Sequence, residues 1–359
     1  MPVRAPSLFL VLVGTLLGCK ACDRAVSALS EAGTSPPYWA HGCVTKDARL
    51  LAVAGDGWGA VELDSGKFLV RAEQGLTFAV HCGDTTAKVY AVNKTIDLPS
   101  GTVGPEDDAW RGGTPLWTGS DGTVARWRQA RDKRGRRDRL PVLEVTPRGG
   151  PERRIEMGPS LFGSIGSVRS GGPSSWVVLP HGELADGGVA LVAGWEPDAA
   201  RYDWAFFRLD PATGRVSQLG PPRASTATRN LGEDFAGAQL SHDRRSHLLT
   251  FSDDSSVEIA LYDPARVEPT REVVLGPGSA PRASLSVRAD RVLVRTEDEG
   301  AARQTLRVVD LESKRETWKR EVPLLSFAGF LPDGSVVYFT STRRIFRVNA
   351  DGTDRWRVE

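Results

Sequence analysis

The most strongly charged stretch of the chain is residues 126–139, RWRQARDKRGRRDR, where eight basic side chains and two aspartates give a net charge of +6. A guanidinium group can donate paired hydrogen bonds to a carboxylate or a phosphate, so clustered arginines suit anion binding. Trp127 lies within this basic run and favours a contact surface. A solvated, self-repelling loop is the alternative interpretation. The candidate anion- or partner-binding residues are Arg126, Arg128, Arg131, Lys133, Arg134, Arg136, Arg137 and Arg139.

Residues that would indicate catalysis or a metal site do not form a recognisable pattern. The five histidines have no carboxylate or second ligand at a metal-site spacing. The sequence contains no Gly-x-Ser-x-Gly elbow and no phosphate-binding loop. Residues 349–354, NADGTD, resemble part of a calcium loop but lack its distal glutamate, so they favour a turn. We therefore expect no catalytic residue, metal or cofactor.

Residues 1–18, MPVRAPSLFLVLVGTLLG, have the pattern of a signal peptide. Arg4 is their one charged side chain, and an apolar stretch of eleven residues runs from Leu8 to Gly18. Such a stretch is too short to span a bilayer as a stable helix, but it is typical of a secretory signal. We expect residues 1–18 to be removed on export.

The residues LLGC, Leu16 to Cys19, resemble a bacterial lipobox. The resemblance implies a lipoprotein in which Cys19 is the acylated first residue, carrying chains such as palmitate, and in which residues 19–37 form a flexible tether. Lys20 replaces the aspartate that retains lipoproteins at the inner membrane, which favours the outer membrane of the cell envelope, with the body facing the periplasm or the surface. Ordinary secretion with a coincidental cysteine is the alternative.

Three further cysteines follow, Cys22, Cys43 and Cys82. An exported compartment permits disulfides, and the preferred pair is Cys43 with Cys82, which leaves Cys22 in the tether. In the alternative, all three are unpaired thiols.

The elements that must position these groups are short strands, because the whole chain has 38 glycines and 23 prolines and the sequence shows no long helical pattern. Turns with an aspartate recur between apolar runs about every 48 residues. The markers of this first turn series are Asp47, Asp84, Asp121, Asp186, Asp243, Asp290 and Asp333. A second turn series alternates with the first, at Asp64, Pro99, Pro147, Asp210, Asp263, Asp310 and Asn349.

Two alternating turn series predict four strands in each repeat. One four-stranded sheet cannot bury both of its faces, whereas sheets arranged radially pack face to face. We predict an all-β fold in which residues 38–359 form a β-propeller of seven four-stranded blades, within a range of six to eight. A β-sandwich would not predict one period through to the C-terminus. Closure of the ring would rest on face packing or on an edge strand from residues 36–42, PPYWAHG.

Three repeats resemble those of known propeller families. Residues 330–356, FLPDGSVVYFTSTRRIFRVNADGTDRW, look like TolB-type repeats, with a Pro-Asp-Gly turn before a strand. Asp310 and Trp318 in VVDLESKRETWKREV match the spacing of pyrroloquinoline-quinone-type repeats, and RLDPATGRVSQL keeps Thr213 and Gly214 but has Gln218 where that motif has tryptophan. These resemblances imply a repeat propeller, but the departures do not support quinone chemistry.

The formal net charge of +1 gives no overall field for nucleic acid or for a membrane surface. Lipid anchor, tether and propeller together resemble in plan the lipoprotein propeller of the outer-membrane β-barrel assembly machinery. The resemblance implies a non-catalytic, lipid-anchored protein that binds or scaffolds a protein or anionic component of the envelope. The alternative is an envelope enzyme, either a quinone- or metal-dependent oxidoreductase or a carbohydrate hydrolase or lyase, with its site at the mouth of the propeller channel.

Overall fold

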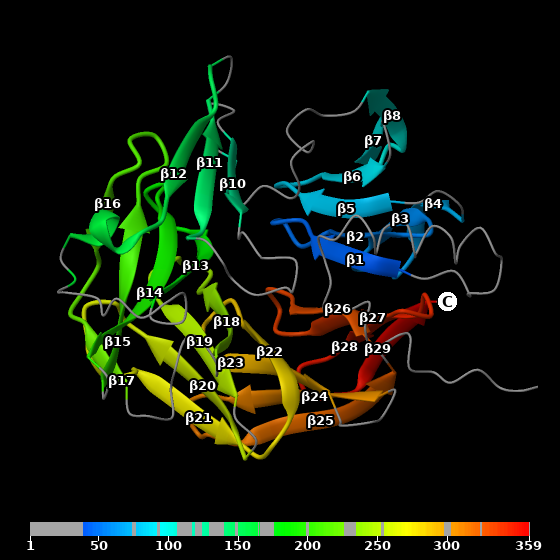
Figure 1. Ribbon diagram of the computed structural model, residues 1–359. Helices are drawn as coiled ribbons and strands as arrows, with labels where there is room; N and C mark the ends of the chain where they lie inside the picture. Colours follow the sequence, from blue (N-terminus) through cyan, green and yellow to red (C-terminus); the bar gives the residue numbers. More distant parts are fainter. Residues whose placement is uncertain are drawn as a thin grey trace, which may run out of the picture.

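Strands dominate the structure, a computed structural model of the chain. It describes residues 39–73, 77–91, 94–105, 117–118, 124–128, 140–147, 150–163, 165, 176–198, 201–225, 235–252, 255–297, 303–323 and 325–358. Within these residues the strands form seven antiparallel sheets in a ring (Figure 1). The prediction of an all-β, seven-bladed propeller is therefore confirmed.

The first three blades hold strands in sequence order from the inner to the outer edge. Blade 1 contains β1 (Trp39–Val44), β2 (Leu50–Gly55), β3 (Trp58–Glu62) and β4 (Phe68–Ala72). Blade 2 contains β5 (Thr77–Cys82), β6 (Ala87–Ala91), β7 (Lys94–Leu98) and β8 (Thr102–Pro105). Blade 3 contains β9 (Trp117–Thr118), β10 (Val124–Arg128), β11 (Val142–Thr146) and β12 (Arg153–Glu156), followed by the short 3-10 helix η3 (Pro159–Phe162).

The remaining four blades repeat this meander. Blade 4 contains β13 (Trp176–Glu183), β14 (Val189–Asp198), β15 (Arg201–Leu209) and β16 (Val216–Gln218), with β17 (Arg223–Ser225) also paired to β15. Blade 5 contains β18 (Phe235–Leu240), β19 (His247–Ser252), β20 (Val257–Tyr262) and β21 (Arg271–Leu275). Blade 6 contains β22 (Ser279–Leu285), β23 (Arg291–Glu297), β24 (Arg303–Asp310) and β25 (Glu316–Pro323). Blade 7 contains β26 (Leu325–Phe330), β27 (Val336–Thr340), β28 (Ile345–Val348) and β29 (Asp354–Val358).

The two predicted turn series fall where the repeat requires them. Described markers of the first series lie between the first and second strands of their blades, and markers of the second series lie at the turns between the third and fourth strands; Asp121 is outside the described residues. Asp47 shows the local cause, because its Oδ1 accepts hydrogen bonds from Thr45 Oγ1 (2.6 Å) and from the backbone N–H of Arg49 (3.1 Å). Ala48 beside it takes a φ of 55°. The carboxylate thus fixes the tight turn that reverses the chain.

Apolar side chains fill the spaces between neighbouring blades. Six buried clusters join blade 1 to 2, 3 to 4, 4 to 5, 5 to 6, 6 to 7 and 7 to 1. On the other face of blade 2, toward blade 3, the described buried cluster is the small pair Ala79 and Tyr90. Across the other six boundaries, neighbouring blades therefore share one buried cluster. No single blade is expected to fold alone, because its apolar faces would be exposed to water.

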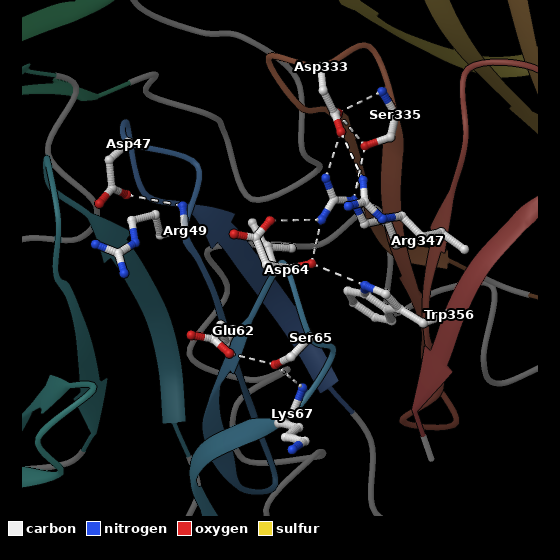
Figure 2. A network of polar contacts seen from close by, with 12 residues as sticks. Asp47, Arg49, Glu62, Asp64, Ser65, Lys67, Asp333, Ser335, Arg347 and Trp356 are labelled. Carbon is white, nitrogen blue, oxygen red and sulfur yellow. Dashed lines mark hydrogen bonds and ion pairs between the residues drawn. The ribbon is translucent and has the colours of Figure 1, made fainter.

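Among the described strands, those of blade 1 and blade 7 each come from one continuous part of the chain, so the ring closes there without strand exchange. Arg347 of β28, only 4 % exposed, points from blade 7 into the β3–β4 turn of blade 1 (Figure 2). Its Nη2 lies 2.7 Å from Asp333 Oδ2, while Nη1 lies 3.4 Å from Asp64 Oδ1 and donates to the carbonyl of Leu63. Trp356 Nε1 donates to the same carbonyl at 3.1 Å. In the described residues, face packing and this polar contact close the ring, and residues 39–42 belong to β1, the first strand of blade 1.

The same kind of contact recurs at four other blade boundaries. In each, an arginine of one blade donates to backbone carbonyls in a turn of the next blade. The pairs are Arg153 with Ala212, Arg223 with Pro264, Arg271 with Ala289, and Arg320 with Gly352. Because a guanidinium has five donors and turn carbonyls have no ladder partner, one side chain satisfies several backbone groups at once. These four arginines and Arg347 therefore have a structural role at blade boundaries.

Candidate functional site

Strand direction divides the propeller into two faces. In every blade the first strand starts, and the second strand ends, on the face where β1 begins at Trp39. We call this the entry face; both turn series lie on the opposite turn face. The chain leaves β10 at Arg128 and returns as β11, so the basic run connects these strands on the entry face. The tether predicted before Trp39 would reach the ring on the same face.

Strands β10 to β12 hold the described part of the basic run in a charged network. Arg126, 7 % exposed, is directly opposite Glu144 of β11 in the strand register. Glu144 is itself 1 % exposed, is ion-paired to Arg128, and lies 2.8 Å from Arg154 Nη2. Burial raises the pKa of Glu144, but hydrogen bonds and charge from Arg128 and then Arg154 outweigh it, so the pKa is lowered overall. Three guanidinium groups thus lie around the buried carboxylate of Glu144, and Arg154 also pairs with Glu152 at 3.2 Å.

The structure thus describes two of the eight predicted binding residues. Arg126 and Arg128 are engaged within the protein, and they orient the chain as it leaves blade 3. The other six lie outside the described residues; they are Arg131, Lys133, Arg134, Arg136, Arg137 and Arg139.

Where the described chain begins, Trp39 is clamped at the boundary of blades 7 and 1. Trp39 is 1 % exposed, and the guanidinium carbons of Arg71 and Arg343 each lie 5.8 Å from its ring centre. Glu73 joins both arginines, at 2.5 Å and 2.6 Å. Ser326 donates to the Trp39 carbonyl. These contacts therefore fix the start of the first strand, where the predicted tether would join the propeller.

A disulfide joins Cys43 to Cys82, with Cα atoms 5.9 Å apart. These residues belong to β1 and β5, the first strands of blades 1 and 2, so the covalent link spans a blade boundary. Cys19 and Cys22, predicted for lipidation and for the tether, lie outside the described residues.

Three of the five histidines, His41, His81 and His181, lie on the first strands of their blades. First strands of neighbouring blades contact one another around the ring axis. His181 of blade 4 and His247 of blade 5 form a pair, with Nε2 and Nδ1 2.6 Å apart. Burial lowers the pKa of His181 to about 4; burial and then the charges of His181 and Arg223 lower that of His247. The sequence analysis did not find this pair, because its members are 66 residues apart and no motif links them.

The described residues place no group of three or more histidine, cysteine, aspartate or glutamate side chains around a common metal position. Among the same residues, no helix has the length and apolar character required to cross a membrane.

Comparisons with known proteins identify the class of fold. No protein-family model matches the chain, and no curated protein is significantly similar to it in sequence. Among solved structures, the chain is similar to Kuenenia stuttgartiensis hydrazine synthase, at 14 % identity and a TM-score of 0.53 over 89 % of this chain and 97 % of that one. It is also similar to Kluyveromyces lactis Hsv2, at 12 % identity and a TM-score of 0.51 over 90 % and 99 %. At these identities the similarity shows the propeller fold alone.

Proposed function

We propose that the protein is a non-catalytic, lipid-anchored β-propeller of a bacterial cell envelope, which binds an acidic protein partner through its entry face. One observation supports this proposal: β10 ends at Arg128 and β1 begins at Trp39 on the same face of the ring, so the β10–β11 connection and the proposed tether would both extend from that face. An anchor and a binding loop on one face would hold the partner between the propeller and the membrane. Because propellers host both enzymes and binding proteins, the proposal rests on this placement and on charge, and not on fold.

The lipid anchor has its own test. We expect the full chain to incorporate labelled palmitate in a bacterial host that processes lipoproteins, and the variant Cys19→Ala to lose the label. Cys22→Ala is the matched control, because it removes the neighbouring thiol and leaves the LLGC sequence intact. Label that persists in Cys19→Ala, or that never appears in the parent chain, would contradict lipidation at Cys19.

Binding through the entry face is tested by crosslinking in cells followed by mass spectrometry. A six-fold serine variant removes the positive charge of the basic run at Arg131, Lys133, Arg134, Arg136, Arg137 and Arg139. The matched control removes six exposed basic side chains of the turn face, at Arg49, Lys67, Arg245, Arg266, Lys314 and Arg315. We expect the first variant, and not the second, to lose the partner. Loss in neither or in both variants would contradict binding through the basic run.

A further inference from the structure

Two arginines lie directly opposite each other at the inner edge of blade 6. Arg282 of β22 and Arg295 of β23 are partners in the strand register. Like charges in this position repel, because the Cβ atoms of such pairs are only about 5 Å apart. Arg295 donates to the carbonyl of Leu325 in β26 at 3.3 Å, so this face of the sheet looks toward blade 7. Arg295 is two residues from the end of β23, where this strand reaches the entry face, and its partner Arg282 is the middle residue of β22, so the pair lies toward the entry face.

Two hydrogen-bond donors of this face have no acceptor in the described part of the chain. Arg295 Nε and Ser284 Oγ are buried and have no hydrogen-bond partner. Ser284 is two residues from Arg282 on β22, so both side chains project from the same face of the strand. Arg282 is exposed, and no carboxylate of the described residues pairs with it. A buried donor without an acceptor is costly, so this arrangement needs an acceptor from elsewhere.

The nearby charges do not neutralise the pair. Burial and then the charge of Arg282 lower the pKa of Arg295 to about 10, with Glu297 acting in the opposite direction. Arg295 is thus still a cation at neutral pH. Glu297 also accepts a hydrogen bond from Gln304 Nε2 at 3.0 Å, so its carboxylate is shared. Two guanidinium groups therefore face one shared carboxylate.

We propose that Arg282, Arg295 and Ser284 form a binding site for an oxyanion, either a carboxylate or a phosphate group, at the inner edge of blade 6. Guanidinium forks and a hydroxyl are the groups that commonly bind such oxyanions in proteins. An oxyanion here would accept from Arg295 Nε and Ser284 Oγ, and its charge would offset the repulsion between the arginines. The site is on blade 6 and needs neither the lipid anchor nor the basic run of blade 3, so it stands or falls separately from the proposed function.

The test is calorimetry of the full chain, purified in detergent, in inorganic phosphate, in acetate and in chloride at constant ionic strength. We expect phosphate, acetate or both to raise the melting temperature by several degrees relative to chloride. A response to phosphate alone would assign a phosphorylated ligand, and a response to acetate alone would assign a carboxylate. Equal melting temperatures in all three salts would overturn the site.

Variants locate the effect. Arg282→Gln should weaken binding of the responding anion about tenfold, since it removes one charge-assisted donor. In chloride the same variant should melt at the same or a higher temperature, because it relieves the repulsion; a lower temperature would show a structural role and overturn the proposal. Arg288→Gln, at an exposed arginine of the β22–β23 turn on the other face, is the matched control and should bind as the parent does.

Two carboxylates of the chain itself could occupy the proposed oxyanion site, and this alternative must be tested. Asp298 and Glu299 follow β23 in the sequence and lie outside the described residues. The double variant Asp298→Asn, Glu299→Gln should bind the anion as well as or better than the parent chain. Anion binding that appears only in this double variant would make the loop's own carboxylates the occupant and overturn a site for an external ligand.

Discussion

Arg347 is the most deeply buried arginine among the contacts that close the ring between blades 7 and 1. Its guanidinium is buried and joins two aspartates and a backbone carbonyl from opposite ends of the chain. In propellers that close by strand exchange, backbone hydrogen bonds join the first and last parts of the chain. Here side chains such as Arg347 join them. The contact is long-range in sequence, since Arg347 and Asp64 are 283 residues apart.

Substituting Arg347 should therefore be costly. We expect Arg347→Met to lower the free energy of unfolding by about 2 kcal/mol, because Asp333 and the Leu63 carbonyl each lose one donor while keeping a second, Arg355 and Trp356 respectively. Arg355→Gln is the matched control, since Arg355 also pairs with Asp333 but is 41 % exposed, and it should cost less than about 1 kcal/mol. Urea unfolding measures both values; equal effects of the two variants would contradict the role given to Arg347.

The buried histidine pair makes stability depend on pH. Burial lowers the pKa of His181 to about 4, so between pH 6.5 and 4 the unfolded chain binds protons that the folded chain does not. The free energy of unfolding should therefore fall as the pH drops from 7 to 5, by roughly 1–2 kcal/mol from His181.

Two variants separate this effect from general acid sensitivity. His181→Gln should show a smaller difference in unfolding free energy between pH 7 and pH 5 than the parent chain. His242→Gln, at an exposed turn position, should behave as the parent chain does. The assignment fails if both variants retain the full pH dependence.

At the scale of elements, the repeat could be predicted from sequence because its signals are local. Asp47, Asp243 and Asp333 each accept a hydrogen bond from the backbone N–H two residues later. Each turn therefore depends only on residues that are close in sequence. The contacts between blades could not be predicted in this way. Arg223 reaches carbonyls about 40 residues away and His181 meets His247, and such partners depend on how neighbouring blades are rotated.

The disulfide tests how much one blade boundary contributes. It links the first strands of blades 1 and 2 across a sequence separation of 39. We expect the double variant Cys43→Ser, Cys82→Ser to lose about 3–4 kcal/mol of unfolding free energy, because a loop of this length is no longer closed in the unfolded chain. Cys22→Ser should be neutral under the same urea titration. A double variant as stable as the parent would show that the link contributes little.

For the whole molecule, the two faces differ in what they present. The turn face contains the aspartate turns, whose carboxylates are used within the protein. The entry face receives the chain at Trp39 and bears the connection from β10 to β11 and the arginine pair of blade 6. This division follows from strand direction alone, so it could be deduced once the blade register was known.

The most direct test of the account is site-specific photo-crosslinking from each face in cells. A photoreactive residue would replace Lys94, exposed at the start of β7 on the entry face, or Lys314, exposed in the β24–β25 turn on the turn face. We predict a defined protein crosslink from position 94 that disappears when the basic run is neutralised, and none from position 314. A defined crosslink from position 314 alone would contradict binding through the entry face.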